Sequence, residues 1–300
     1  MRVLQVYVGA DEGAKPIVKR LSLADIRTAL VGGFEDFFSM PTHLAFLGAV
    51  YPIAGVIIAY FASRADLVQL VFPLASGLAL IGPIVATGLY EMSRKRERGL
   101  ATRWADAFDV LRSPSLPAIG ALSLLLLAIF FAWIGAAQLI YKAFYGAAKQ
   151  ASFMSFFSDV VSSERGLWMF VVGGFVGFVF AALAYAVSVI AFPLLLDRDV
   201  GLVGALRTSF SVIRANPLVM AAWALTIAVL IVLGSLPLFV GLAVVMPVMG
   251  HASWRFYRLA VERDPAHEIP AEWPPWRVGR PASQISRPHA VLFPWPPKDR

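Results

Sequence analysis

The residues of this chain best suited to acid–base chemistry are its four histidines and a few carboxylates beside apolar stretches. His43, Glu91 and His251 fall at the same side of the bilayer if successive apolar stretches alternate in direction. Two imidazoles and a carboxylate within hydrogen-bond reach could take up and release protons as general acids and bases do. Polar side chains also complete the hydrogen bonding of helix ends. We expect that structural use for this candidate polar cluster.

Sequence motifs for nucleotide binding, metal binding or covalent catalysis are absent from the chain. It contains no P-loop, GxSxG or HExxH pattern and no paired carboxylates, which are common signatures of enzymes. It has no cysteine, which excludes disulfides, Cys-ligated zinc, iron–sulfur clusters and c-type haem attachment. Only His251 falls within an apolar stretch, and a single histidine makes no haem or metal site. We therefore expect no cofactor, no metal and no enzymatic activity.

The composition indicates a membrane protein. Hydrophobic residues make up 59% of the chain and charged residues 15%, with a mean hydropathy of +0.72. A soluble domain carries about 25% charged residues, so the bilayer must be the solvent for much of this chain. No Asp, Glu, Lys or Arg falls near the middle of a predicted span. This argues against an ion-coupled transporter, which needs such groups at depth, but leaves room for lipid handling.

Long apolar stretches predict six membrane-spanning helices. About 20 helical residues cross the roughly 30 Å hydrocarbon core. The last stretch, 218–250, is too long for one span, and we divide it at Pro237, because proline disfavours a continuous helix. Residues 1–20 then form a cytoplasmic segment, 21–262 the membrane domain and 263–300 a Pro- and Trp-rich cytoplasmic tail. The predicted spans are residues 43–61, 67–90, 116–141, 167–196, 218–233 and 237–257.

Basic residues indicate how these spans are oriented. All but four of the 26 Lys and Arg lie on one set of alternating segments, which includes both ends of the chain; the exceptions are Arg64, Lys142, Lys149 and Arg165. Basic segments stay cytoplasmic, so we expect both termini inside, in a bacterial inner membrane. The net charge of +7 then favours contact with anionic lipid headgroups over nucleic acid.

Three amphipathic stretches suggest an internal repeat, although an interfacial helix, a break and a span also form a generic membrane pattern. Residues 21–41, 101–117 and 201–217 each place apolar side chains at helical spacing, end at a proline and precede an apolar span. The second span of each unit also contains a proline, and we predict helix breaks at Pro83, Pro193, Pro237 and Pro247. The expected fold is an all-α membrane protein of three hairpins, each preceded by an amphipathic interfacial helix. That helix could rest on lipid or on the bundle's own cytoplasmic end.

Two further segments bear on packing and partners. Gly173 and Gly177 are four residues apart in the fourth span, a spacing that lets helices approach closely. It serves packing within the chain or formation of a homo-oligomer, and we favour the first. The outer loop 142–166 is rich in aromatic residues. It predicts a short helix on the outer membrane face, where a membrane-protein partner could bind.

Several blocks of the sequence resemble a family of uncharacterised, predicted bacterial integral membrane proteins. They are KPIVKRLSLADIRTALVGGFEDF, PLASGLALIGPIVATGLYEMSR, VIRANPLVMAAW and VMPVMGHASWRFYRLAV. The resemblance covers about residues 15–262 and implies a polytopic inner-membrane protein without implying an activity. A weaker similarity, at residues 211–223, extends to the membrane domain attached to some glycerophosphodiesterases. It concerns only the shared arrangement of an amphipathic segment followed by Asn-Pro and an apolar span.

These observations favour a non-enzymatic membrane protein that organises, assembles or assists other membrane components. The alternative is a transporter or lipid-translocating protein without ionisable residues at the midplane. An enzyme built on the candidate polar cluster ranks third, because the cluster lacks any recognised catalytic motif.

Overall fold

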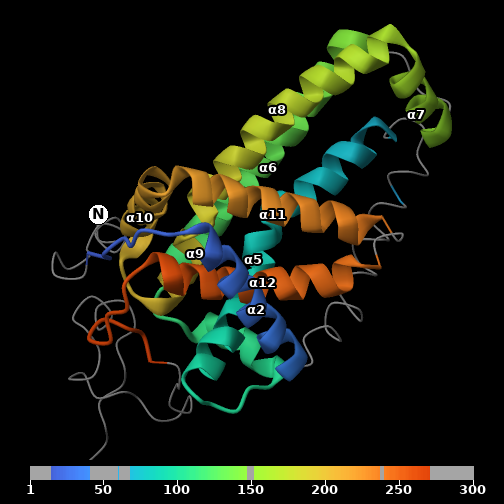
Figure 1. Ribbon diagram of the computed structural model, residues 1–300. Coiled ribbons are helices and arrows are strands. Elements are labelled where there is room, and N and C mark those ends of the chain that lie inside the picture. Colours follow the sequence, from blue (N-terminus) through green and yellow to red (C-terminus); the bar gives the residue numbers. More distant parts are fainter. Residues whose placement is uncertain (1–14, 41–59, 61–67, 147–151, 237–239, 271–300) are drawn as a thin grey trace, which may run out of the picture.

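The computed structural model describes residues 15–40, 60, 68–146, 152–236 and 240–270. Every named element in this part of the chain is a helix, and the only β-pairing found there consists of two isolated bridges, Val18 with Val261 and Arg198 with Glu268. Figure 1 shows the arrangement. The elements are α2 (Leu23–Ser39), η3 (Val68–Leu70), α5 (Val71–Glu97), η4 (Trp104–Arg112), α6 (Leu116–Tyr145), α7 (Phe153–Ser162), α8 (Glu164–Ser188), α9 (Ala191–Asp197), α10 (Gly201–Ala215), α11 (Pro217–Ser235) and α12 (Leu242–Ala260).

Four segments among the described residues are long and apolar enough to cross a membrane: Val71–Glu97, Leu116–Tyr145, Glu164–Asp197 and Pro217–Ser235. They coincide with the second to fifth predicted spans. The first predicted span lies outside the described residues except for Tyr60. The sixth coincides with α12, which is not among the four and carries His251, Arg255 and Arg258 in its second half. The all-helical membrane fold is therefore confirmed, while the count of six spans stays a prediction.

Two pairs of helices form the visible hairpins. Helices α6 and α8 pack side by side and extend away from the rest of the bundle, with α7 folded back at their far tip (Figure 1). Helices α11 and α12 pack as the second pair, and α5 contacts both α6 and α12. Gly177 lies against α6, because a Cβ built there would be 3.1 Å from the Trp133 ring. A Cβ at Gly173 would meet nothing within 4 Å.

The prolines affect the helices in different ways. Helix α8 ends at Ser188, just before the short helix α9 that contains Pro193, and proline cannot donate the hydrogen bond that would continue the turn. Helices α5 and α12 instead run through Pro83 and Pro247, which corrects the prediction of breaks there. A long helix loses only one hydrogen bond at such a proline, and membrane helices tolerate that loss when neighbouring groups compensate. Pro237 lies outside the described residues.

The core forms around α9, whose seven residues are all buried. Trp223 of α11 and Trp254 of α12 are fully buried in the same core. Trp223 stacks on Phe256 with ring centroids 4.5 Å apart. The second part of the interrupted span is therefore enclosed by protein, which allows the residues at its end, Asp197 and Arg198, to contact several other segments.

The three amphipathic stretches pack against the bundle. Helix α2 lies along α12, η4 along α5, and α10 along α9 and α8. The approach of α2 to α12 is very close, because a Cβ built on Gly33 would lie 2.6 Å from the Cβ of Ala252. The middle stretch is a 3₁₀-helix rather than an α-helix. One face of each stretch therefore rests on protein, although exposed apolar side chains such as Phe38 and Phe108 remain on the other face.

Candidate functional site

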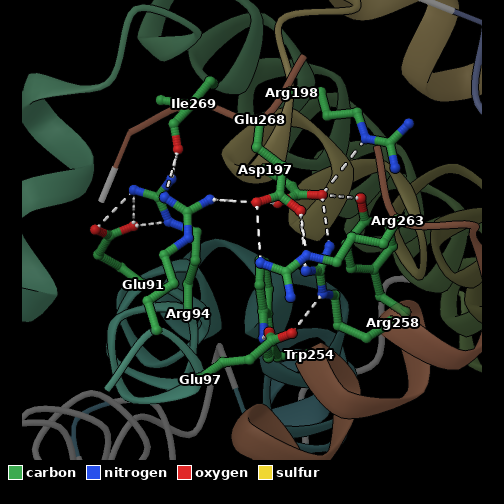
Figure 2. Close-up of polar contacts among 12 residues, drawn as sticks. Glu91, Arg94, Glu97, Asp197, Arg198, Trp254, Arg258, Arg263, Glu268 and Ile269 are labelled. Carbon is green, nitrogen blue, oxygen red and sulfur yellow. Dashed lines mark hydrogen bonds and ion pairs between the residues drawn. The ribbon is translucent and has the colours of Figure 1, made fainter. Parts of the chain in front are cut away.

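Charged side chains gather at one end of the bundle, where five segments meet. The segments are the second half of α2, the last turns of α5, the end of α9, the second half of α12 and residues 261–270. Figure 2 shows the part of this region around Asp197. We call the whole region the ion-pair network. Its central members are Asp36, Glu91, Ser93, Arg94, Glu97, Arg98, Asp197, Arg198, His251, Arg255, Arg258 and Glu268.

Asp36 joins α2 to α5 and α12. Its carboxylate is fully buried and accepts hydrogen bonds from Arg255 Nε at 3.0 Å and Nη2 at 2.6 Å. It also accepts a bond from Arg96 and one from Ser93 Oγ at 2.8 Å. A carboxylate held in this way by two guanidinium groups is a strong, charge-assisted contact. The amphipathic helix α2 is thus attached to the bundle through a charged residue on its buried face.

His251 lies beside the same group. Its Nδ1 atom is 2.8 Å from Ser93 Oγ, which in turn donates to Asp36, and all three residues are buried. In a catalytic triad the imidazole lies between the carboxylate and the hydroxyl, so that it can accept the hydroxyl proton. Here the hydroxyl lies between the other two groups. This order favours a structural link between α5, α12 and α2.

Glu91 has a different partner. Its two oxygens accept hydrogen bonds from Arg94 Nε at 2.8 Å and Arg94 Nη2 at 2.9 Å, and both side chains are almost completely buried (Figure 2). Arg94 Nη1 also donates to the carbonyl of Ile269 at 2.8 Å. The structure therefore places Glu91 and His251 in one network but pairs them with different neighbours. His43, the third member of the candidate polar cluster, lies outside the described residues.

Asp197, the last residue of α9, is at the centre of Figure 2. Its Oδ2 atom accepts from Tyr257 Oη at 2.7 Å and from Arg258 Nη1 at 3.0 Å. Arg98 Nη2 is 4.0 Å from Oδ1, too far for a hydrogen bond but close enough for charge attraction. Arg198, also buried, lies on the other side of the carboxylate, with its Nε 3.6 Å from Oδ2. Asp197 thereby connects the enclosed part of the interrupted span to α12.

Residues 261–270 close the network. Glu268 accepts hydrogen bonds from Arg263 Nε at 2.8 Å, Arg98 Nη2 at 3.0 Å and Arg258 Nη2 at 3.1 Å. Burial opposes ionisation of this carboxyl, but these guanidinium groups outweigh burial and hold its pKa at about 2. The backbone adds further contacts, because the Ile269 carbonyl accepts from Arg98 and the Ile269 N–H donates to the Asp197 carbonyl at 2.7 Å. This segment therefore binds α5, α9 and α12 together.

Glu97 completes the region at the end of α5. It accepts hydrogen bonds from Trp254 Nε1 and from Arg258 Nε, each at 3.0 Å. Arg258 consequently contacts three carboxylates, those of Glu97, Asp197 and Glu268. Removing one partner of a buried ion pair costs about 3–5 kcal/mol, because the remaining charge stays buried without compensation. The network should therefore be a cooperative unit of the fold.

The predicted and observed sites overlap only in part. We predicted His43, Glu91 and His251, whereas Asp36, Asp197, Arg258 and Glu268 make most of the contacts. The sequence contains a signal for Asp36, which follows Gly33 by three positions and so shares its helix face. Glu268 has no such signal, because it lies in a Pro-rich segment without periodicity. Among the described residues, no group of three or more His, Asp or Glu is arranged to hold a metal ion.

Comparison with known proteins finds one family that is similar to part of the chain. Residues 71–197 match the model of the family described as Predicted integral membrane protein (DUF2189). With the four candidate spans, this match identifies a multi-pass membrane protein. No curated protein and no solved structure matches the chain. The DUF2189 match runs from the start of α5 to the end of α9. It therefore includes Glu91, Arg98 and Asp197, while the partners of Arg98 and Asp197 on α12 and in residues 261–270 lie beyond it.

Proposed function

We propose that this chain is a non-enzymatic, multi-pass membrane protein that organises, assembles or assists other membrane components. The observation that carries the proposal is the state of the two candidate acid–base residues. Glu91 and His251 each have 0% of their surface exposed and are held by neighbouring helices. A general acid or base must reach the proton that it transfers, directly or through a water. Side chains so enclosed serve the fold better than they serve a substrate.

The ion-pair network supports a scaffold role. It joins five segments from across the chain, so the helices are fixed relative to one another at one end of the bundle. The hairpin of α6 and α8 extends away from this end and exposes large apolar side chains, among them Phe131, Phe175 and Phe178. A bundle that is held rigid at one end and exposes an apolar hairpin beyond the other is suited to contact with lipid and with other membrane proteins. We expect the partner to be a membrane protein or a second copy of the chain.

We propose the following topology. The chain spans a bacterial inner membrane six times, as three hairpins that each follow an amphipathic helix, with both termini in the cytoplasm. The basic residues support it, because those of α5, α12 and residues 261–270 meet in the ion-pair network. Lys142 and Arg165 lie instead near the opposite tip of the α6–α8 hairpin. This separation follows the positive-inside rule.

The alternative function, transport or translocation of lipid, draws support from the interruption between α8 and α9. Transporters bind substrate where a membrane helix is broken and polar backbone is exposed to a cavity. In this chain all seven residues of α9 are buried, and α9 packs against α5, α6, α10 and α12. The interruption is therefore surrounded by packed side chains, and we favour the scaffold role.

The proposal can be tested with the full chain purified in mild detergent from its native membrane and then reconstituted in vesicles. We expect a defined membrane protein or lipid class to remain bound at constant stoichiometry, as measured by mass spectrometry, and no turnover of lipid or peptide substrates. Turnover that follows the protein through successive purification steps would overturn the proposal. Accelerated exchange of labelled lipid between the two leaflets would establish the alternative instead.

A further inference from the structure

Helix η4 presents an apolar face that stays exposed among the described residues. Trp104 and Phe108 are each 60% exposed and Leu111 is 59% exposed. The rings of Trp104 and Phe108 meet edge to face, with centroids 6.2 Å apart, and Leu111 is exposed one turn further along the same helix. In a water-facing helix such a patch would be costly, at about 25 cal/mol for each Å² of apolar surface.

The opposite face of η4 is fixed to α5, so the patch cannot turn inward. Lys95 Nζ donates to Asp106 Oδ1 at 2.8 Å and also to Asp109. Burial opposes ionisation of Asp106, but the bonds from Lys95 and from the Arg103 N–H outweigh it and lower the pKa of this carboxyl. Ala107 packs closely on Gly88, where a built Cβ would be 3.1 Å from the Ala107 carbonyl oxygen. The orientation of η4 is thus determined by its polar and small residues.

The position of η4 along the chain places it at the edge of the bilayer. Only residues 113–115 separate it from α6, which is a candidate span. A chain advances at most about 3.6 Å per residue, so the end of η4 lies within roughly 15 Å of the start of that span. Its other end follows α5, a second candidate span whose last turns carry Arg94, Lys95 and Arg96.

From this arrangement we infer that η4 is a membrane-surface anchor that inserts Trp104, Phe108 and Leu111 into the headgroup region of an anionic leaflet. Tryptophan concentrates at that level of the bilayer, and amphipathic helices bury their apolar face about 5–10 Å into it. Basic residues stand at both ends of the helix, at Arg103 and Arg112. Positive charge in this position attracts anionic headgroups.

The anchor has a consequence for the ion-pair network. Asp106 and Asp109 bind Lys95, which lies in the last turn of α5 with Arg94 and Arg96. The depth at which η4 rests on the lipid therefore sets the depth of the end of α5, and with it the level of the whole network. This inference concerns a lipid contact and holds whether the chain acts as a scaffold or as a lipid translocator.

The chain has no cysteine, so a single labelling site can be introduced cleanly. We suggest Phe108→Cys in the full chain, labelled with an environment-sensitive fluorophore and reconstituted in nanodiscs of phosphatidylcholine and phosphatidylglycerol. Ala266→Cys is the matched control, because Ala266 is also exposed but lies in a turn of the segment that closes the network. Both variants replace an exposed side chain, and unchanged elution and helical content verify their fold.

The label at Phe108 is expected to lose fluorescence when the lipids carry bromine near the headgroup, and to be shielded from a water-soluble quencher. The label at Ala266 is expected to behave in the opposite way. Equal exposure of both labels to the water-soluble quencher overturns the inference. Shielding of Phe108 from both quenchers also overturns it, because protein then covers the patch, either as a second copy or as the Pro-rich tail.

The preference for anionic lipid is tested separately, by varying the phosphatidylglycerol content of the nanodiscs. Quenching at Phe108 by brominated lipid is expected to increase with the fraction of phosphatidylglycerol, and to increase less when Arg103 is changed to Gln. Arg165→Gln is the control, because Arg165 is exposed and pairs only with Asp159 at the opposite tip of the α6–α8 hairpin. Quenching that is independent of lipid charge overturns the assignment to an anionic leaflet.

Discussion

The ion-pair network and the far tip of the α6–α8 hairpin use polar side chains in different ways. In the network several partners come from distant parts of the chain, as when Arg255 binds Asp36 across 219 positions, whereas the pair of Glu91 and Arg94 is local. At the tip they are local: Tyr145 donates to Asp159 at 2.5 Å, and Arg165 bonds the same carboxylate at 3.1 Å. The two regions lie at opposite ends of the molecule (Figure 1). Enclosed charges therefore include contacts between distant segments, whereas the more exposed charges at the tip connect neighbouring parts of the chain.

The surroundings explain this difference. The carboxylates of Asp36 and Asp197 have 0% exposed surface, whereas the Asp159 side chain is 32% exposed and that of Arg165 is 51% exposed. Surface ion pairs contribute little, because water and salt screen them. Buried charges must be paired, and the loss of one partner is severe. The comparison predicts large effects of substitution at one end and small effects at the other.

The largest effect is expected for Asp36→Ala. The change leaves Arg255 and Arg96 without their shared carboxylate and detaches α2 from the bundle. We expect the free energy of unfolding to fall by about 3–5 kcal/mol, measured by thermal or denaturant unfolding in detergent. Glu35→Ala is the control, because Glu35 is the exposed neighbour on the same helix. Equal effects of the two substitutions would show that the ion pairs of Asp36 do not stabilise the fold.

Close packing gives the next effect. Gly33→Ala puts a methyl group 2.8 Å from the backbone of Ala252, so α2 must move away from α12. Overpacking of this kind costs about 1–3 kcal/mol. Gly173→Ala is the matched control, because no atom lies within 4 Å of a Cβ built at Gly173. We expect a lower unfolding midpoint for Gly33→Ala than for Gly173→Ala, measured under the same conditions. An unchanged midpoint for Gly33→Ala would mean that α2 and α12 are not in tight contact.

A smaller effect that depends on pH is expected from Glu268. Its pKa is about 2 in the folded protein, against 4.5 for an ordinary glutamate. The stabilisation is therefore complete above pH 4.5 and is lost as the pH falls towards 2, because the unfolded chain takes up the proton first. Glu268→Gln should be less stable than the natural chain at neutral pH, and the difference should shrink in this acidic range. A difference that stays constant with pH would show that Glu268 does not act through its charge.

The smallest effect is expected at the hairpin tip. Asp159→Asn removes the charge that Arg165 and Tyr145 contact, but the site is open to water. We expect no measurable change in the unfolding midpoint. A loss as large as that of Asp36→Ala would show that the tip is a buried structural centre like the network, and would contradict the comparison on which these predictions rest.

The membrane fold could be predicted from the sequence because apolar length is a local property. The predicted spans 116–141 and 218–233 correspond to Leu116–Tyr145 and Pro217–Ser235. The prolines were harder to interpret. Pro193 follows the end of α8, while Pro83 lies inside a continuous helix. The outcome depends on whether neighbouring groups compensate for the lost hydrogen bond, and that information is not local.

The buried face of α2 also could not be identified from local sequence alone. Leu23 and Phe34 are large apolar residues of this amphipathic stretch, yet they are exposed, at 65% and 43%. The buried residues are Ala29, Gly33, Asp36 and Phe37. The small residues allow α2 to approach α12 closely, and the carboxylate meets a guanidinium there. In a membrane protein, large apolar side chains can face lipid, so hydrophobicity alone does not identify the interior.

The sequence by itself determined that this chain is an all-helical membrane protein. This property depends on composition and order along the chain, since each span must satisfy its own backbone hydrogen bonds in lipid. Only the tertiary structure decided which charges meet. Asp36, Asp197 and Glu268 are far apart in the sequence, and their arginine partners become known only when α2, α9 and residues 261–270 are packed against α5 and α12. Ion pairing depends on distance in space, and the fold sets that distance.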